Sequence, residues 1–171
     1  STTFAAANLQ PDDIVGVSFW LISMAMMAAT VFFLWETQNV SGKWKTSLVV
    51  IALVTFIAAV HYFYMRDVWI STGETPTVYR YIDWLLTVPL QMIEFYLILA
   101  AIGIASIGIF WRLLVGTIIM LVAGFMGEAG ILLSPTAGFV IGMAGWLYIL
   151  YEIFAGEAGK AAANEASAAV Q

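Results

Sequence analysis

The sequence lacks cysteine and is poor in charge, and each shortage excludes a class of protein. Without cysteine, a disulfide framework and thiol chemistry are both excluded. Charged residues make up 10% of the chain, and they form no basic patch of the kind that binds nucleic acid. Only one histidine is present, His61, and we predict no metal site.

Apolar residues, in contrast, dominate the chain. They make up 63% of the 171 residues, and the mean hydropathy is +0.96. A soluble domain of this size does not need so much apolar surface, so the composition indicates a polytopic membrane protein. The apolar runs are continuous rather than alternating, which favours helices over the strands of a membrane barrel. We therefore predict an all-α transmembrane helical bundle that forms a single domain over residues 1–171.

Five apolar runs are long enough to cross a bilayer as helices. We predict spans at residues 14–35, 46–64, 79–99, 107–126 and 137–154. Asp12 or Asp13 can cap the first span, and Gly138 and Gly142 give the fifth span a face for close helix approach. Pro89 lies inside the third span, where a membrane helix tolerates proline as a kink rather than a break.

The third span carries polar residues that line up on one side of the helix. At about 100° per residue they all fall within a sector of roughly 80°, and they are Arg80, Asp83, Thr87, Gln91 and Glu94. Charge at this depth is costly, so such residues face a bundle interior and usually carry function. The two carboxylates lie eleven positions apart, about 16 Å along the axis or half of the hydrocarbon thickness. Two acids at this separation predict a proton path with one relay station near mid-membrane and another toward one face.

The surroundings of each acid predict a different role. Arg80, one turn from Asp83, would hold that carboxylate charged and ready to accept a proton from a buried cation. Glu94 has no arginine nearby on its own helix, so burial would leave it protonated at the start, as a proton donor requires. His61 lies on the neighbouring span and could form a hydrogen bond with Asp83.

The same residues also have structural explanations. A lone buried histidine is often a satisfied structural group, and Gln91 alone could join two helices by a hydrogen bond. Arg80 and Asp83 could form a structural ion pair. Tryptophans on apolar helices usually pack or anchor at the membrane interface. Those on the predicted spans include Trp20, Trp84 and Trp146.

The basic residues predict the orientation of the chain in the membrane. Basic residues collect on the cytoplasmic side of membrane proteins. With the N-terminus outside, four of them lie on that side, and these are Lys43, Lys45, Arg112 and Lys160. Only Arg66 then lies outside, apart from Arg80 within a span. On this orientation Asp83 lies in the extracellular half of the membrane and Glu94 in the cytoplasmic half.

The stretch RYIDWLLTVPLQMIEFYLIL resembles the third helix of the microbial rhodopsins, and that of the proteorhodopsins in particular. The likeness extends to HYFYMRDVW, LVGTIIMLVAGFMGEAG and GWLYILYEIFAGEAGK, so it covers essentially the whole chain. This resemblance implies a light-driven outward proton pump in the bacterial plasma membrane. It also implies all-trans retinal as the cofactor, bound as a protonated Schiff base.

The resemblance also implies roles for the polar residues of the third span and for the histidine. Asp83 matches the counterion and primary proton acceptor of the family, and Glu94 matches the donor that resupplies the Schiff base. Arg80 matches the extracellular arginine, and Thr87 the hydroxyl beside the acceptor. His61 matches the histidine that pairs with the acceptor.

Retinal contacts follow from the same resemblance. Trp84, Met120 and Trp146 match positions that sandwich or flank the polyene. Gln91 matches the colour-tuning site, where glutamine accompanies blue absorption and leucine green, so we expect the blue-absorbing type. A polar amide beside the polyene alters how its charge distributions are stabilised.

Assembly is a further implication of the resemblance. The family forms pentameric or hexameric rings, and the contacts between subunits lie near Trp20 and His61. Besides retinal and protons, the expected partners are therefore the lipid bilayer and further copies of the same chain.

The resemblance has one large departure, because the family has seven helices and its retinal lysine lies on the seventh. This chain offers five spans, helices A to E and the approach to F, so we expect a truncated form that cannot pump alone. Its lysines, Lys43, Lys45 and Lys160, lie in predicted connectors or the tail. Two other functions stay open, a sensory rhodopsin that signals to a transducer and a retinal-free proton-coupled transporter. Glu94 argues against the sensory function, since sensory members usually lack a carboxylate donor.

Overall fold

The structure is a computed structural model that describes residues 8–74, 76–103 and 106–165. Its elements are helices, and the described residues contain no strand. They are α1 (Ile14–Glu36), α2 (Gly42–Thr72), α3 (Thr77–Ala101), α4 (Ile107–Glu128), α5 (Pro135–Phe154) and α6 (Glu157–Glu165). Five segments are long and apolar enough to cross a membrane, and the last of them includes α5 and most of α6. The predicted all-α membrane bundle is confirmed.

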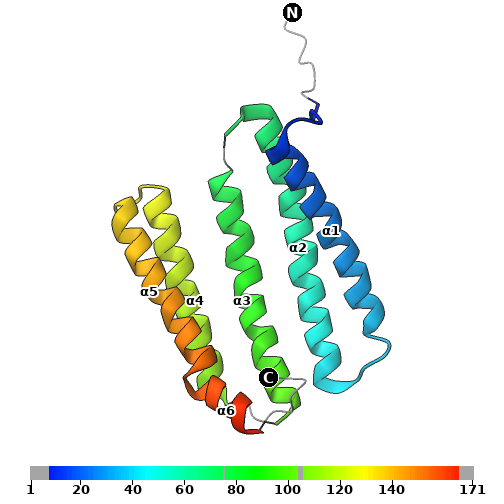
Figure 1. Cartoon of the computed structure of the whole chain (residues 1–171), viewed down its shortest axis with the longest axis vertical. Helices are drawn as coiled ribbons and strands as arrows, with labels where there is room; N and C mark the ends of the chain where they lie inside the picture. The colour runs from blue at the N-terminus through cyan, green and yellow to red at the C-terminus, as the bar shows by residue number, and fades with distance from the viewer. Residues whose placement is uncertain (1–7, 75, 104–105, 166–171) are drawn as a thin grey trace, which may run out of the picture.

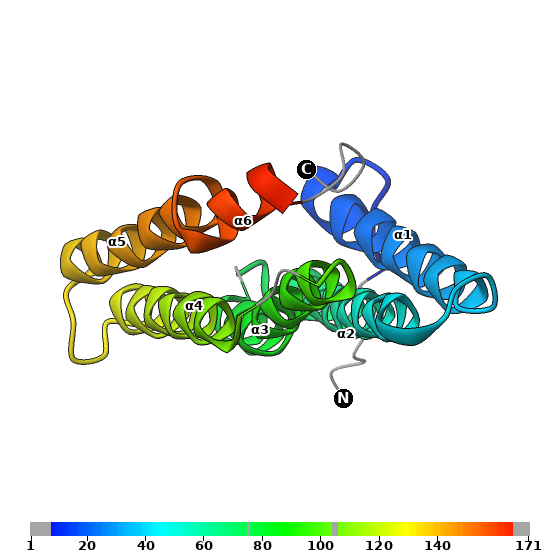
Figure 2. The same cartoon turned by 90° about the horizontal axis from the view of Figure 1, so that it is seen from below.

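The long helices run up and down side by side in chain order (Figure 1). Seen from below, α2, α3 and α4 form a row, and α1 and α5 lie on the same side of that row at its two ends (Figure 2). Each helix packs mainly against its neighbours in sequence. The bundle is therefore an open arc with α3 at its centre, which places one side of α3 against α2 and another against α4.

The first two helices are joined by polar contacts as well as by apolar ones. Ser23 donates to the Ala59 carbonyl at 2.9 Å, and the Thr30 and Thr55 hydroxyls share a hydrogen bond of 2.8 Å. Asp13, which was predicted as a possible cap, accepts the Gly16 N–H at 3.0 Å and so begins α1. Small polar residues can join helices in this way because the membrane offers no water to compete with them.

The second helix is longer than the apolar run predicted. It continues past residue 64 to Thr72 and ends at Gly73, whose φ of 69° is left-handed. At 1.5 Å per residue its 31 residues extend about 46 Å, well beyond the roughly 30 Å of hydrocarbon. The helix is therefore longer than the hydrocarbon is thick, and in its last turns Arg66 and Asp67 form an ion pair of 2.8 Å. An apolar pattern cannot indicate such an extension, because it ends where the hydrocarbon ends.

Glycines allow α4 and α5 to approach closely. A Cβ added to Gly138 would lie 2.5 Å from the Gly127 Cα, and one added to Gly145 would lie 3.1 Å from the Gly116 carbonyl oxygen. Gly142 is buried in the same contact, against the Met120 carbonyl. The predicted close-approach face of the fifth span is therefore confirmed. Helix α3 also continues through Pro89 without a break, as predicted.

Candidate functional site

The site is centred on Asp83, in the second turn of α3. Asp83 is 2% exposed, and its Oδ1 has no hydrogen-bond partner among the described residues. The His61 Nδ1 of α2 lies 3.7 Å from that oxygen, an ion-pair distance rather than a hydrogen bond. The same Nδ1 lies 2.9 Å from the Ile57 carbonyl, one turn back along α2. The structure therefore brings the predicted pair together and leaves one carboxylate oxygen available.

Thr87 is buried with Asp83 on the same side of α3. Its hydroxyl donates to the backbone carbonyl of Asp83 at 2.9 Å rather than to the carboxylate. These two polar residues of the third span therefore face the interior of the bundle. Helix periodicity was sufficient to find them, because residues four apart lie on one face.

The sequence had led us to expect that Arg80 pairs with Asp83, but the two side chains do not pair. Its guanidinium instead donates to Glu128 Oε1 at 2.6 Å, at the end of α4, and the Thr77 hydroxyl reaches the same oxygen at 2.9 Å. The long arginine side chain extends toward the nearby helix ends, where a carboxylate is more accessible than the buried Asp83. The positive group beside Asp83 is therefore His61, when it is protonated.

The other two polar residues predicted on this side of α3, Glu94 and Gln91, lie in different surroundings. Glu94 is partly exposed, and its carboxylate lies close to the buried hydroxyl of Ser47 on α2. Gln91 is exposed and contributes to none of the grooves described below. Among the described helices, Asp83 and Thr87 are therefore buried, Glu94 and Arg80 are partly exposed, and Gln91 is exposed. The roles predicted for these residues stay predictions.

An apolar groove of about 510 Å³ lies between α3, α4 and α5. Three residues predicted to contact a polyene line it, namely Trp84, Met120 and Trp146. Gly138 and Gly142 also line it, and they let α5 lie close against α4 along this wall. Aromatic and apolar walls of this kind suit an elongated apolar ligand. Trp84 directly follows Asp83, so the groove and the buried acid are adjacent on α3.

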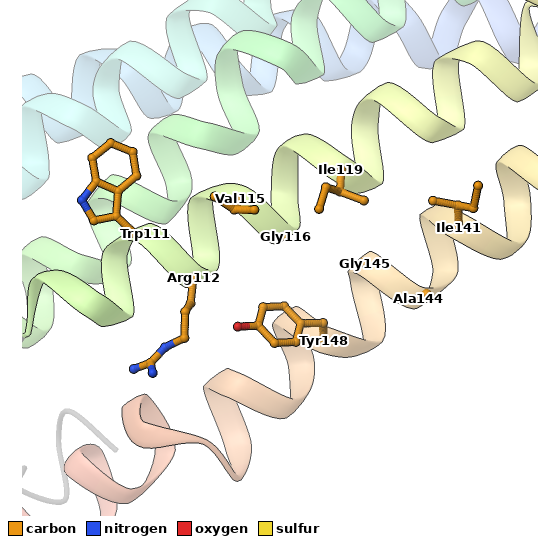
Figure 3. Close-up of a pocket in the computed structure, with 9 residues that line it drawn as sticks. All are labelled: Trp111, Arg112, Val115, Gly116, Ile119, Ile141, Ala144, Gly145 and Tyr148. Atoms are coloured by element: carbon orange, nitrogen blue, oxygen red, sulfur yellow. The ribbon is translucent and has the colours of Figure 1, made fainter. Parts of the chain in front are cut away.

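A second groove, of about 580 Å³, lies between α4 and α5 alone (Figure 3). Trp111 and Tyr148 stand beside it, with Arg112 toward one end. It contains none of the residues predicted to contact a cofactor. Exposed aromatic and aliphatic residues of this kind are expected on a surface that meets lipid.

An acidic and basic cluster closes the end of the bundle where α5 meets α6. Arg112 of α4 lies 3.5 Å from Glu152 and also binds Glu157, which accepts a hydrogen bond from Ser106 at 2.8 Å. Glu152 is 4% exposed and also accepts the backbone N–H of Ala158. Neither Glu152 nor Glu128 was predicted from the sequence as a site residue. The signal for Glu128 was available, because antiparallel α3 and α4 bring the start of one beside the end of the other.

The lysines lie away from the groove. Lys43, predicted in a connector, lies in the first turn of α2 and donates to the Ala100 carbonyl at the end of α3, at 3.0 Å. Lys45 is exposed in the same turn, and Lys160 lies in α6. None of the three lines the groove that Trp84 and Trp146 border.

These features define a class: a membrane helical bundle with a buried acid beside a histidine and an adjacent aromatic groove for an apolar ligand. The chain belongs to the family of bacteriorhodopsin-like proteins, whose family model matches residues 13–171. The family resemblance predicted from the sequence is confirmed.

Three relatives show how close the match is. The chain is 61% identical to a blue-light absorbing proteorhodopsin of Gamma-proteobacterium Hot 75m4, over 98% of this chain and 67% of the relative. A crystal structure of a blue light-absorbing proteorhodopsin from Med12 has 57% identity and a TM-score of 0.73, over 83% of this chain and 68% of that one. The structure of xanthorhodopsin, described as a light-driven ion pump with dual chromophore, has 28% identity and a TM-score of 0.78. It covers 92% of this chain and 69% of that chain. The chain thus spans about two thirds of the length of these relatives.

Proposed function

We propose that this chain is part of a light-driven outward proton pump in which Asp83 accepts the proton and Glu94 resupplies it. The observation that carries the proposal is the buried Asp83, whose Oδ1 lacks a hydrogen bond and which directly precedes Trp84, a residue that lines the aromatic groove. A proton acceptor needs a free oxygen away from bulk water, and few structural roles leave a buried carboxylate oxygen unbonded. The similarity to a protein described as a light-driven ion pump supports the same function.

Retinal is the cofactor that the groove would hold. The groove is lined by Trp84, Met120 and Trp146, which can enclose a flat apolar chain. When bound through a lysine, retinal supplies the light absorption and a proton-carrying cation. Gln91, exposed on the neighbouring side of α3, would tune the colour toward blue.

The polar residues of α2 and α3 would then move the proton. Asp83 would take the proton at its free Oδ1, and His61, 3.7 Å away, would adjust how readily that oxygen is protonated. Thr87 would hold the α3 backbone beside the acid through its bond to the Asp83 carbonyl. Arg80, held by Glu128, would provide a fixed positive charge toward the end where protons leave. Glu94, about 16 Å from Asp83 along the axis, would return a proton from the other side.

The setting of the pump is part of the proposal. We place the protein in the bacterial plasma membrane with its N-terminus outside, as one bundle domain over residues 1–171. We also propose a pentameric or hexameric ring with Trp20 and His61 near the contacts. The exposed Trp20 stacks with Phe63 and Arg66, which gives α1 and α2 an aromatic outer face.

Light-induced acidification by cells that carry the full-length protein tests the proposal. We expect the medium to acidify in the light, and Asp83→Asn to abolish the effect while leaving a coloured protein. Glu94→Gln should slow steady pumping but leave the first turnover intact. An Asp83→Asn protein that pumps at the full rate would remove Asp83 from the acceptor role. A colourless full-length protein would remove retinal from the proposal.

A further inference from the structure

Thr117 of α4 is a buried polar group that the proposed pump does not use. It is fully buried, and within the part of the chain that the structure describes its hydroxyl is the one buried hydroxyl that lacks a hydrogen bond. Threonines inside helices usually bond the carbonyl four residues back, yet this one makes no such bond to Leu113. An orphaned hydroxyl at full burial is costly and calls for a partner.

The neighbours of Thr117 along α4 show which way it faces. Phe110, seven residues before it, packs its ring against Tyr96 of α3 at 5.5 Å. A Cβ added to Gly124, seven residues after it, would lie 3.1 Å from the Tyr81 hydroxyl of α3. Residues seven apart return to nearly the same side of a helix. Thr117 therefore lies on the side of α4 that faces α3.

Two ring contacts show which part of α3 lies at its level. Helices α3 and α4 are antiparallel, so seven residues back from Tyr96 and seven on from Phe110 give Pro89 opposite Thr117. The rings of Tyr81 and Phe125 lie 5.4 Å apart, and they lead to the same pair. Eight residues on from Tyr81 is Pro89, and eight residues back from Phe125 is Thr117. Thr117 is therefore level with the one proline inside α3.

Proline at this position leaves an acceptor without its helix donor. Pro89 has no N–H, so the Leu85 carbonyl cannot receive the usual bond from residue 89. Prolines persist in membrane helices when a neighbouring hydroxyl or an ordered water satisfies the freed carbonyl. An orphaned donor on α4 and a freed acceptor on α3 thus lie at the same depth.

We propose that Thr117 and the Leu85 carbonyl bind a common buried water, which joins α4 to α3 at the turn before Pro89. The hydroxyl makes no direct bond to any described residue, whereas a water needs only two to four polar partners to be held in a buried site. The water lies between the levels of Asp83 and Glu94 and ties the part of α3 between them to α4. Thr117 is a positioning residue in this assignment. The assignment does not rest on the pump function.

Solid-state NMR of the full-length protein in lipid bilayers tests the site. Labelling leucine carbonyls with ¹³C and leucine amides with ¹⁵N selects leucines that precede leucine, which in this chain are Leu85, Leu113 and Leu132. Thr117→Val should shift the Leu85 carbonyl toward the unbonded value and leave Leu132, in the loop after α4, unchanged. Thr117→Ser, which keeps the hydroxyl, should leave all three in place. A shift at Leu113 instead of Leu85, or no shift at all, would overturn the proposal.

Two further measurements distinguish a bridging water from a direct hydrogen bond or an indirect effect of the substitution. In a Pro89→Ala background residue 89 supplies its own N–H, so Thr117→Val should no longer move Leu85; a shift that persists there would overturn the proposal. Magnetisation from water protons should reach the Leu85 carbonyl in the parent protein and be lost in Thr117→Val. A Leu85 shift without such transfer would mean a direct bond and would overturn the water site. Thr55→Val, which removes a buried hydroxyl from α2, is the matched control and should move none of the three carbonyls.

Discussion

Arg80 at the start of α3 and Glu128 at the end of α4 form an ion pair with an Nη2–Oε1 distance of 2.6 Å. This pair uses the guanidinium that the sequence had assigned to Asp83. The basic side chain beside the buried acid is then His61, 3.7 Å away, and the ion pair joins α3 and α4, two of the three helices that border the aromatic groove. Asp83 and Arg80 of α3 therefore have partners on different neighbouring helices, His61 of α2 and Glu128 of α4.

The first prediction concerns this ion pair. Glu128→Gln should lower the free energy of unfolding by about 0.2–1 kcal/mol, because both side chains are partly exposed and the pair is screened. Thr77→Val should cost less in a Glu128→Ala background than in the parent, since both donors share Glu128 Oε1 and alanine removes it. Thermal and denaturant unfolding in detergent measure both effects. Glu74→Gln, an exposed acid near the same end, is the control, and an equal loss there would show that the pair contributes nothing specific.

The second prediction concerns pH and the cap of α1. The Gly16 N–H and the Trp69 indole N–H hold the pKa of the Asp13 carboxyl below its ordinary value of 3.8. The charged form is therefore favoured in the folded state, and its stabilising effect is complete above that ordinary value. This effect is lost as the pH falls through the lower pKa of the folded protein. The melting temperature of the parent should fall more steeply on acidification below about pH 4 than that of Asp13→Asn.

Asp12→Asn is the matched control for this prediction. Asp12 is exposed and directly precedes Asp13, so its replacement should leave the pH dependence of the parent unchanged. Trp69→Phe should remove part of the dependence, because the backbone N–H donor of Gly16 remains. Identical acid slopes for Asp13→Asn and the parent would show that this carboxyl does not link α1 to α2.

The third prediction concerns the glycine contact of α4 and α5. Gly138→Ala should destabilise the bundle by about 1–3 kcal/mol, because the new Cβ would lie 2.5 Å from the Gly127 Cα and backbone cannot yield as a side chain can. Gly108→Ala, where the nearest atom is 3.6 Å away, should be close to neutral. Unfolding of the two variants under the same conditions checks the difference. Equal stability would mean that the helices can separate slightly at no cost.

Much of the fold could be predicted from the sequence because a membrane restricts the possible structures. Continuous apolar runs gave all five spans, and helix periodicity placed Asp83 and Thr87 on one buried side. The partner of Arg80 could not be predicted in this way, because periodicity describes one helix and says nothing of how far a long side chain reaches. Glu128 also fell within a predicted loop rather than on a helix, and so it was not considered.

For the groove, the lining residues could be expected from the sequence, but their exposure depends on how the helices pack. Trp84, Met120 and Trp146 were expected at a cofactor from a family resemblance, and three helices do bring them to one groove. The resemblance could not show that Gln91 would be exposed within the described helices. Thr117 had no signal in the sequence, since a threonine on an apolar helix draws notice only when its burial and its missing partner are known.

Flash-induced infrared spectroscopy of the full-length protein measures whether Asp83 receives the proton. After a flash, we expect a carbonyl band of a newly protonated carboxylic acid, which is absent in Asp83→Asn and moved in frequency in Asp83→Glu. The band should remain in Glu94→Gln but decay more slowly, because the donor is lost. A band that appears unchanged in Asp83→Asn would mean that another group takes the proton.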